Sequence, residues 1–317
     1  MSQPTQPATP RRGNNILLIA GVVLLLVAIA AGVYYGFFAG RQAPEMAAVG
    51  EASLIEQASA PSDLQAYLDR TLTPEQKQIL TYRVEGNRML DVSASDPETG
   101  GSFKAQEIEF KALDTANPEP HFVDLRIKGL EIVLPPDRAV QGLGTIKGSM
   151  VYAYRYDAAT RTLEVPAVQL AMDGVATLGF TGSFTEVTLF AGTPDEALAG
   201  VSGGLIKAFT FQLKDETLLR GLLEETAKSQ GTDLATMKTQ GVAMLTILES
   251  QVTGSIEKQA LAAARTILDK EGGVTLTISA SPTQPFPFAQ FMLIGQSSGG
   301  LPDLSALEPL NLTITAE

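Results

Sequence analysis

Residues 16–38 form an uninterrupted apolar run, which constrains this chain more than any other feature of its sequence. No charged residue lies between Arg12 and Arg41. About 20 consecutive apolar residues are enough to cross the roughly 30 Å hydrocarbon layer of a membrane. The run therefore predicts a transmembrane helix. A cleaved signal peptide is the alternative, but the apolar core of such a peptide is shorter, at about 7–15 residues.

The charges on either side of the apolar run predict its orientation. Arg11 and Arg12 precede the run, whereas Arg41 on the other side is followed mainly by glutamates. Positively charged residues favour the cytoplasmic side of a membrane. We therefore expect residues 1–15 to form a cytoplasmic tail, residues 39–60 to form a linker, and the bulk of the chain to be exported.

Small residues recur every four positions along the apolar run and just beyond it, at Ala28, Gly32, Gly36 and Gly40. Residues four apart lie on one side of a helix, and small side chains there let two helices approach closely. These four residues are therefore candidates for helix–helix packing in a homodimer. The alternative is that glycine and alanine are simply common in membrane helices.

The composition argues against several classes of function. The net charge of −12 argues against a nucleic-acid partner, because phosphate binding needs clustered lysine and arginine. The same charge argues against docking on anionic lipid head groups. The chain has no cysteine and one histidine, which excludes disulfide bonds and thiolate metal sites. We expect no cofactor and no metal ion.

Apolar and charged residues alternate along much of residues 61–197. Ile108 and Phe110, for example, are separated by Glu109. Alternation with a period of two predicts strands that have one buried and one wet face. Clusters of Gly, Pro and Asp between these strands favour short turns and antiparallel pairing. Residues 61–197 are therefore predicted to be an antiparallel β-rich domain, which opens with a short helix capped by Asp63.

The pattern becomes mixed in residues 198–317. A strand that carries Phe209 and Phe211 on one face precedes a helix capped by Asp215, and two more helices follow, one of them after Asp233. Two further strands are predicted near the end of the chain, and a stretch rich in proline and phenylalanine connects one to the other. The pattern predicts an α+β domain with a helical insertion of about three helices. The expected fold class is thus α+β: an N-terminal transmembrane helix, an antiparallel β-rich domain, and a C-terminal α+β segment.

Two serine motifs are similar to hydrolase motifs, but neither is complete. Ser202 lies in a G-x-S-x-G pattern that needs a later histidine base, and the single histidine, His121, comes earlier. Ser255 begins an S-x-x-K pattern without its companion motifs, and a serine before a helix is typically an N-cap. We therefore predict that the protein is not an enzyme and has no catalytic, cofactor-binding or metal site. Catalysis by carboxylates alone is an alternative that the sequence leaves open.

Three tyrosines, Tyr152, Tyr154 and Tyr156, fall on one face of a predicted strand. Large aromatic side chains at such positions line an apolar groove or pack a core, and core packing is the expected role here.

The strand and helix motifs of this chain resemble those of the AsmA-like class of Gram-negative envelope proteins. The motifs are Tyr154-Arg155-Tyr156-Asp157, Thr162-Leu163-Glu164-Val165, Phe211-Gln212-Leu213-Lys214-Asp215 and the strand at residues 310–315. The resemblance implies a β-rich body in the periplasm. Together with the apolar run and its flanking charges, it gives the predicted localisation: a single-pass protein of the inner membrane with its N-terminus in the cytoplasm. It also implies an apolar groove for lipid.

These observations lead to two hypotheses for function. The first is a membrane-anchored, periplasmic, non-enzymatic protein that binds a lipid or another apolar ligand in envelope maintenance. The alternative is an envelope scaffold or interaction protein that docks through its helical segment. A continuous apolar groove favours the first, whereas a closed core with exposed leucines and methionines on the helices favours the second.

Overall fold

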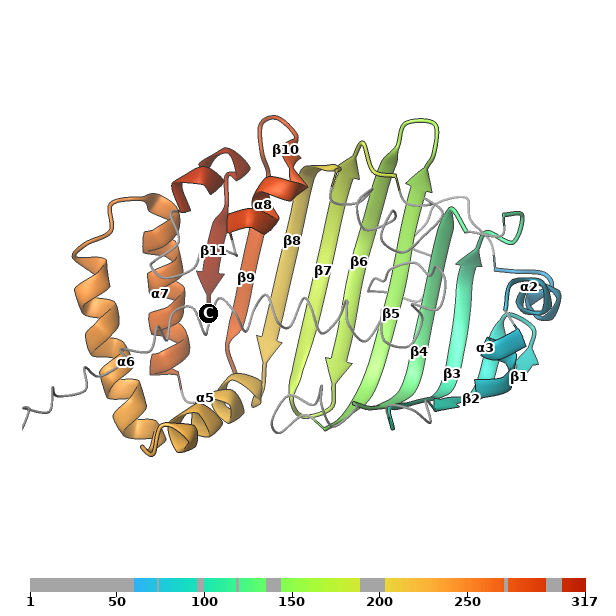
Figure 1. Ribbon diagram of the computed structural model, residues 1–317, viewed down its shortest axis with the longest axis horizontal. Coiled ribbons are helices and arrows are strands. Elements are labelled where there is room, and N and C mark those ends of the chain that lie inside the picture. The colour runs from blue at the N-terminus through green and yellow to red at the C-terminus, as the bar shows by residue number, and fades with distance from the viewer. Residues whose placement is uncertain are drawn as a thin grey trace, which may run out of the picture.

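One large antiparallel sheet dominates the structure (Figure 1). The computed structural model describes residues 60–72, 74–95, 100–117, 120–134, 144–188, 203–270, 273–294 and 304–317. Among these residues the sheet has 11 strands. Ten follow the order β1-β2-β3-β4-β5-β6-β7-β8-β9-β11, and the eleventh, the short strand β10, pairs with β8. The strands are β1 (Leu80–Glu85), β2 (Arg88–Ser95), β3 (Ser102–Leu113), β4 (Phe122–Val133), β5 (Thr145–Asp157), β6 (Thr162–Met172), β7 (Ala176–Thr185), β8 (Leu205–Asp215), β9 (Thr275–Ala280), β10 (Phe286–Pro287) and β11 (Thr313–Ala316).

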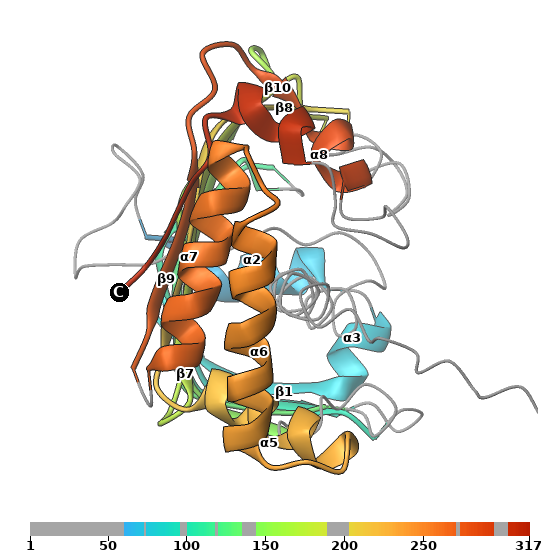
Figure 2. The ribbon, with the colours of Figure 1, turned by 90° about the vertical axis from the view of Figure 1, so that its left-hand side faces the viewer.

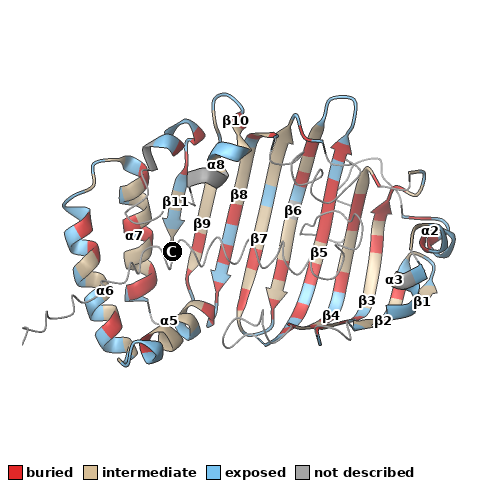
Figure 3. Ribbon diagram, in the orientation of Figure 1, coloured by how far each residue is buried: buried red, intermediate tan, exposed pale blue. Residues whose placement is uncertain are grey.

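The alternation seen in the sequence gives the sheet one apolar and one polar face. Cross-strand partners share a face, so their side chains form rows that run across the strands. One row consists of Met89, Ile108, Ile127, Met150, Leu170, Leu178, Leu213 and Leu276. All of these side chains are buried except Ile108, which is half-buried. The resulting bands of buried residues are visible along the strands in Figure 3. We call this apolar side the inner face.

The opposite, outer face carries charged side chains in matching rows. Glu131 on β4 lies between Lys104 on β3 and Lys147 on β5, at oxygen–nitrogen distances of 3.8 and 3.1 Å. Lys128 on β4 lies 2.8 Å from Glu107 on β3. The lysine side chains of these pairs are exposed, so each pair contributes little to stability. Their effect is to fix which face of the sheet meets water.

The helices lie on the inner side of the sheet (Figure 2). Helices α2 (Leu64–Thr71) and α3 (Pro74–Ile79) lie at the β1 end, whereas α5 (Leu218–Ser229), α6 (Leu234–Glu249) and α7 (Ser255–Asp269) lie at the β11 end (Figure 1). Two shorter helices, α8 (Phe288–Ile294) and the 3₁₀ helix η1 (Leu304–Leu310), complete the described elements.

Two predicted helix caps, Asp63 and Asp233, are confirmed by their hydrogen bonds. The Asp63 carboxylate accepts the backbone N–H of Ala66 at 2.8 Å, and Asp233 accepts that of Thr236 at 2.7 Å. Each bond satisfies a donor that the first turn of a helix would otherwise leave unpaired. The N-cap of α5 is Thr217 rather than the predicted Asp215, although the Asp215 carboxylate accepts the backbone N–H of Leu219 at 2.9 Å and so satisfies one donor of the first turn.

The predicted α+β fold class is wrong. The described chain is mostly a single antiparallel sheet, because β8 pairs with β7 along its length and β9 pairs with β8, so the C-terminal strands extend the same ladder. The helices α5 to α7 are an insertion between two neighbouring strands. The pairing of β8 with β9 could not be predicted from the sequence, because the helical insertion separates the two strands along the chain. The predicted boundary between residues 197 and 198 lies outside the described residues.

No helix in the described part of the chain is long and apolar enough to span a membrane. The predicted tail (1–15), span (16–38) and nearly all of the predicted linker (39–60) lie outside the described residues. The packing residues Ala28, Gly32, Gly36 and Gly40 are outside them as well.

The buried carboxylate of Asp114 holds the connection between β3 and β4. It accepts hydrogen bonds from the backbone N–H groups of Ala116 and His121, both at 3.0 Å, and from the side-chain amide of Asn117 at 2.7 Å. Burial raises the pKa of the Asp114 carboxyl, but these hydrogen bonds outweigh burial and lower its pKa overall. The carboxylate is therefore favoured in the folded state.

A side chain at Gly148 is predicted to destabilise the sheet. Gly148 has a φ of +155°, and a Cβ atom there would lie 1.8 Å from the carbonyl oxygen of Ala171 on the paired strand. Gly148→Ala should lower the free energy of unfolding by about 3 kcal/mol or more, because β5 and β6 must separate locally. The control is Gly86→Ala, where φ is also positive but nothing lies within 4 Å. It should cost about 1 kcal/mol. Urea denaturation of both variants gives the comparison, and equal losses would contradict the contact argument.

Removing the Asp114 charge should lower stability at neutral pH and make it less sensitive to acid. In the wild type, the stability that the ionised Asp114 carboxylate contributes is complete above the ordinary aspartate pKa of about 3.9. It is lost as the pH falls through the lower pKa that this carboxyl has in the folded state. Asp114→Asn should cost about 2 kcal/mol at pH 7, and the difference from wild type should shrink below about pH 3. Asp157→Asn, in an exposed turn, is the control and should cost less. A difference that stays constant from pH 7 to pH 3 would contradict this role.

Candidate binding site: a phenylalanine cluster on the inner face

Five phenylalanines gather on the inner face where β7, β8 and α8 meet. Phe180 and Phe184 come from β7, Phe209 comes from β8, and Phe288 and Phe291 come from α8. We call these five residues the phenylalanine cluster. All five side chains are half-buried rather than buried, so part of each ring lies at the surface.

The rings of the cluster contact one another in a continuous series. Phe180 stacks with both Phe184 and Phe209, at centroid distances of 6.4 and 6.3 Å. Helix α8 adds edge contacts, with Phe288 at 6.4 Å from Phe184 and Phe291 at 5.7 Å from Phe209. Offset and edge-to-face arrangements at such distances are favourable for aromatic pairs.

Gly182 makes room for the rings on β7. Phe180, Gly182 and Phe184 alternate along the strand and share the inner face. A Cβ atom at Gly182 would lie 2.6 Å from the ring of Phe184 and 3.0 Å from that of Phe180. The absence of a side chain therefore lets the two rings lean over this position and stack.

Helix α8 is attached to the sheet just before its first residue. Phe286 and Pro287 of β10 pair with Ile206 and Leu205 of β8, and the backbone N–H of Phe288 donates to the carbonyl of Gly204 at 3.0 Å. Phe286 is buried with Ile206, Leu307 and Leu310 in a small core of their own, and the side chains of α8 that contact this core are only partly buried.

The cluster continues into the apolar rows of the inner face. Phe180 belongs to the row Phe110, Leu125, Tyr152, Val168, Phe180, Phe211, Ile278 and Ile314. No residue of this row or of the cluster carries a formal charge. Tyr152, Tyr154 and Tyr156 are buried in the main core, which confirms core packing as their role.

The chemistry available at the cluster is therefore apolar contact, without side chains that ionise. The buried carboxylates Asp114 and Asp215 serve elsewhere as a loop anchor and as a hydrogen-bond acceptor for the first turn of α5. Burial raises the pKa of Asp215 despite the backbone hydrogen bonds that lower it.

A cavity of about 270 Å³ lies at the opposite end of the strands and includes Lys147 and Asp173 in its lining, so it does not extend the apolar surface.

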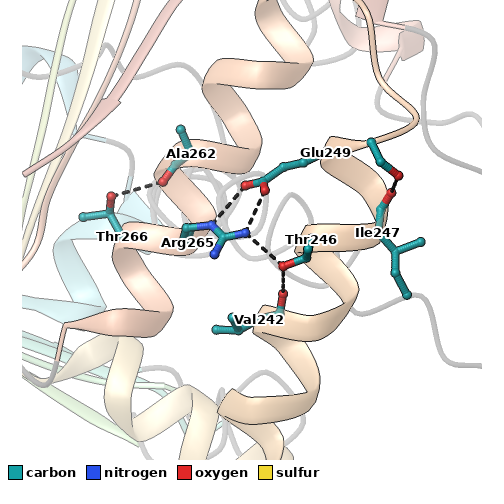
Figure 4. Close-up of polar contacts among 8 residues, drawn as sticks. Val242, Thr246, Ile247, Glu249, Ala262, Arg265 and Thr266 are labelled. Carbon is teal, nitrogen blue, oxygen red and sulfur yellow. Dashed lines mark hydrogen bonds and ion pairs between the residues drawn. The ribbon is translucent and has the colours of Figure 1, made fainter.

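A second surface is formed by the helical insertion. The guanidinium of Arg265 on α7 bonds both carboxylate oxygens of Glu249 on α6, at 3.0 and 2.7 Å, and also bonds the hydroxyl of Thr246 at 3.1 Å (Figure 4). A Cβ atom at Gly241 would lie 2.9 Å from a methyl group of Leu268, so the two helices approach closely there. The neighbouring side chain of Ile247 is 59% exposed.

Of the residues singled out in the sequence, Ser255 and His121 lie on separate parts of the described fold. Ser202 lies outside the described residues. Ser255 is the first residue of α7, and the N-cap is Gly254, so the N-cap role expected for Ser255 is wrong. The His121 ring lies edge-on to Tyr156 at 6.0 Å. Within the described ranges, no group of three or more His, Asp or Glu side chains could hold a metal ion.

The sequence did not reveal the phenylalanine cluster. The sequence predicts that Phe209 lies on the apolar face of a strand. It also predicts that the stretch rich in proline and phenylalanine is a crossover connection. Nothing local indicated that this stretch folds back on β7 and β8.

Comparison with known proteins points to the C-terminal half of the chain. A protein-family model described as "Uncharacterized protein" matches residues 169–317. This span contains all five phenylalanines of the cluster. No curated protein matches the chain.

A methyl group at Gly182 should disturb the cluster, whereas the same change on the outer face should not. Gly182→Ala forces the Phe184 ring to move and should lower the free energy of unfolding by about 1–2 kcal/mol. Gly179→Ala is the matched control on the same strand, since its nearest neighbour would lie at 3.7 Å. Guanidinium denaturation and near-ultraviolet circular dichroism of both variants provide the measurement. Similar losses in the two variants would show that Gly182 is not needed for ring packing.

Proposed function

We propose that this protein is a binding module that holds an apolar ligand, such as the hydrocarbon part of a lipid, at the phenylalanine cluster. The observation that carries the proposal is that five contacting rings are all half-buried rather than buried. Scattered apolar residues are normal on protein surfaces, but contiguous apolar patches typically mark interaction sites.

The uncharged character of the cluster favours hydrocarbon over a charged ligand. Burying a charged group here would cost free energy, because no side chain of the cluster could pair with it. The net charge of −12 further disfavours an anionic head group as the main determinant of binding. The proposal is therefore of a ligand held by its apolar part, with any polar part in water.

Binding without catalysis is the role that fits these residues. A phenylalanine ring neither transfers a proton nor attacks a substrate, so the cluster supplies contact and desolvation only. The periplasmic location predicted from the sequence would place such a site near membrane lipids, and that location stays a prediction.

A scaffold role through the helical insertion is the second candidate, and one observation favours it. Ile247 on α6 is the more exposed of the two exposed large apolar side chains among the described residues, the other being Ile79. A single isoleucine is a small contact compared with five rings, so apolar ligand binding is the better supported function.

Truncating one ring of the cluster should weaken ligand binding. Phe209→Ala removes contacts to both Phe180 and Phe291, and we expect about tenfold weaker binding of a fluorescent fatty-acid probe. The probe is titrated into the detergent-free chain, and native mass spectrometry of the wild type tests for co-purified lipid.

Phe122→Ala is the matched control for this titration. Phe122 is also half-buried, but it lies at the start of β4 opposite Arg155, away from the cluster. Its loss should leave probe affinity unchanged. If the wild type binds no probe and carries no lipid, or if both variants weaken binding equally, the proposed function is wrong.

A further inference from the structure

Strand β1 forms one of the two edges of the sheet, at the end opposite β11 (Figure 1). The β11 edge is partly closed, because the side chain of Gln259 accepts the backbone N–H of Ile314. By contrast, no strand in the described part of the chain pairs with the free side of β1. An edge strand of this kind is a template on which the strand of another chain can pair.

The hairpin turn determines which backbone groups of β1 face this free side. Strands β1 and β2 are joined by the two-residue loop Gly86-Asn87, and Glu85 pairs with Arg88 across it. In such a hairpin the pair that closes the loop is hydrogen-bonded, and the following pairs alternate between non-bonded and bonded. Val84 and Met89 form the next pair. The N–H and C=O groups of Val84 therefore point away from β2, toward the free side.

This part of the edge is held in place by the rest of the sheet. The side-chain amide of Asn87 donates to the carbonyl of Phe110 on β3 at 2.8 Å, and the backbone N–H of Phe110 donates to the carbonyl of Asn87 at 2.9 Å. The side chains of Tyr82 and Val84 are half-buried and pack against the main core. A strand that is already ordered loses little conformational entropy when it binds a partner.

The charges on the outer face of β1 distinguish between the possible registers. Arg83 and Glu85 are 60% and 46% exposed, and Arg83 forms ion pairs with Glu85 and Asp91 of its own chain. Like charges directly opposite each other in a sheet are unfavourable, and opposite charges are favourable. Two antiparallel copies of β1 that pair about Arg83 oppose two arginines, and copies that pair about Glu85 oppose two glutamates. Pairing about Val84 instead places each Arg83 opposite the Glu85 of the second copy.

Helix α3 disfavours a longer overlap, in which the strands would pair about Tyr82. The helix directly precedes β1 and contacts it. A shift toward Leu80 brings the hairpin turn of the second copy alongside α3, whereas pairing about Val84 leaves that turn short of the helix. Ile79, the last residue of α3, is 47% exposed and lies at the end of the interface so defined. A second copy would therefore cover apolar surface there.

We propose that two copies of this chain associate through their β1 edges, antiparallel and centred on Val84. The backbone N–H of each Val84 donates to the Val84 carbonyl of the other copy, which joins the two sheets. The two Val84 side chains meet on the inner face, so this apolar face continues from one copy into the next. The proposal is independent of apolar ligand binding, because the phenylalanine cluster lies on β7, β8 and α8.

A single cysteine in β1 of the full chain tests this interface. The chain has no cysteine, so any disulfide formed by Val84→Cys joins two copies. Cα atoms of a hydrogen-bonded antiparallel pair lie about 5.5 Å apart, within the range that a disulfide spans. Under mild oxidation, this variant should give at least fivefold more disulfide-linked dimer on a non-reducing gel than the control variant Thr81→Cys.

The control cysteine lies on the same strand and is exposed to solvent. In the proposed register Thr81 lies opposite Asn87 of the second copy, so the two Thr81 positions are about 20 Å apart along the strands. Cross-linking by random collision would favour this exposed site. Equal yields from the two variants, or no dimer from Val84→Cys, overturn the proposal.

Charge reversal tests the register by a second route. In the Val84→Cys background, Arg83→Glu opposes like charges across the interface, and so does Glu85→Arg. Each change alone should lower the yield of disulfide-linked dimer at least threefold. An equal mixture of the two variants should restore the yield, because every charge then faces its opposite in the other copy. A local loss of structure in either variant would not be restored by mixing. A mixture that cross-links no better than the separate variants overturns the proposal.

Discussion

The register of the antiparallel ladder is the constraint on which the rest of this structure depends. Strand side chains alternate between faces, so a slip of one residue would turn a strand's apolar side chains to water. Bulges keep the register correct along the strands. Between β5 and β6, Tyr152 pairs with Val168 and Tyr156 pairs with Leu163, a step of four residues against five. The extra residue in β6 returns Leu163 to the inner face, where it is buried.

How much of this fold could be predicted depended on the distance over which each interaction acts. The strand around Ile108 and the caps Asp63 and Asp233 were predictable, because alternation and capping are fixed by residues only a few positions apart. The joining of β8 and β9 into the main sheet was not, since it is determined by cross-strand pairing after a long helical insertion. The phenylalanine cluster could not be predicted for the same reason, because Phe184 and Phe288 come into contact only after the chain has folded back.

The helical insertion can leave the sheet undisturbed because it carries a core of its own. Leu245 and Leu248 on α6 pack with Leu261 and Leu268 on α7, and the Arg265–Glu249 pair joins the same two helices on their exposed side. Helix α7 also contacts the sheet, where the side-chain oxygen of Gln259 accepts the backbone N–H of Ile314 at 2.8 Å. That bond covers part of the open edge of β11, which an unpaired strand would otherwise present to other chains.

The position of the phenylalanine cluster follows from the way these cores divide the molecule. The main core occupies the inner face, and a smaller core around Ile206, Phe286 and Leu310 lies beneath α8. The five rings lie between the two and are buried members of neither, which is why they are all half-buried. A side chain that completes a core cannot leave it without a large loss of stability. Rings at such a boundary can exchange one apolar neighbour for another, and reversible binding of an apolar ligand requires this property.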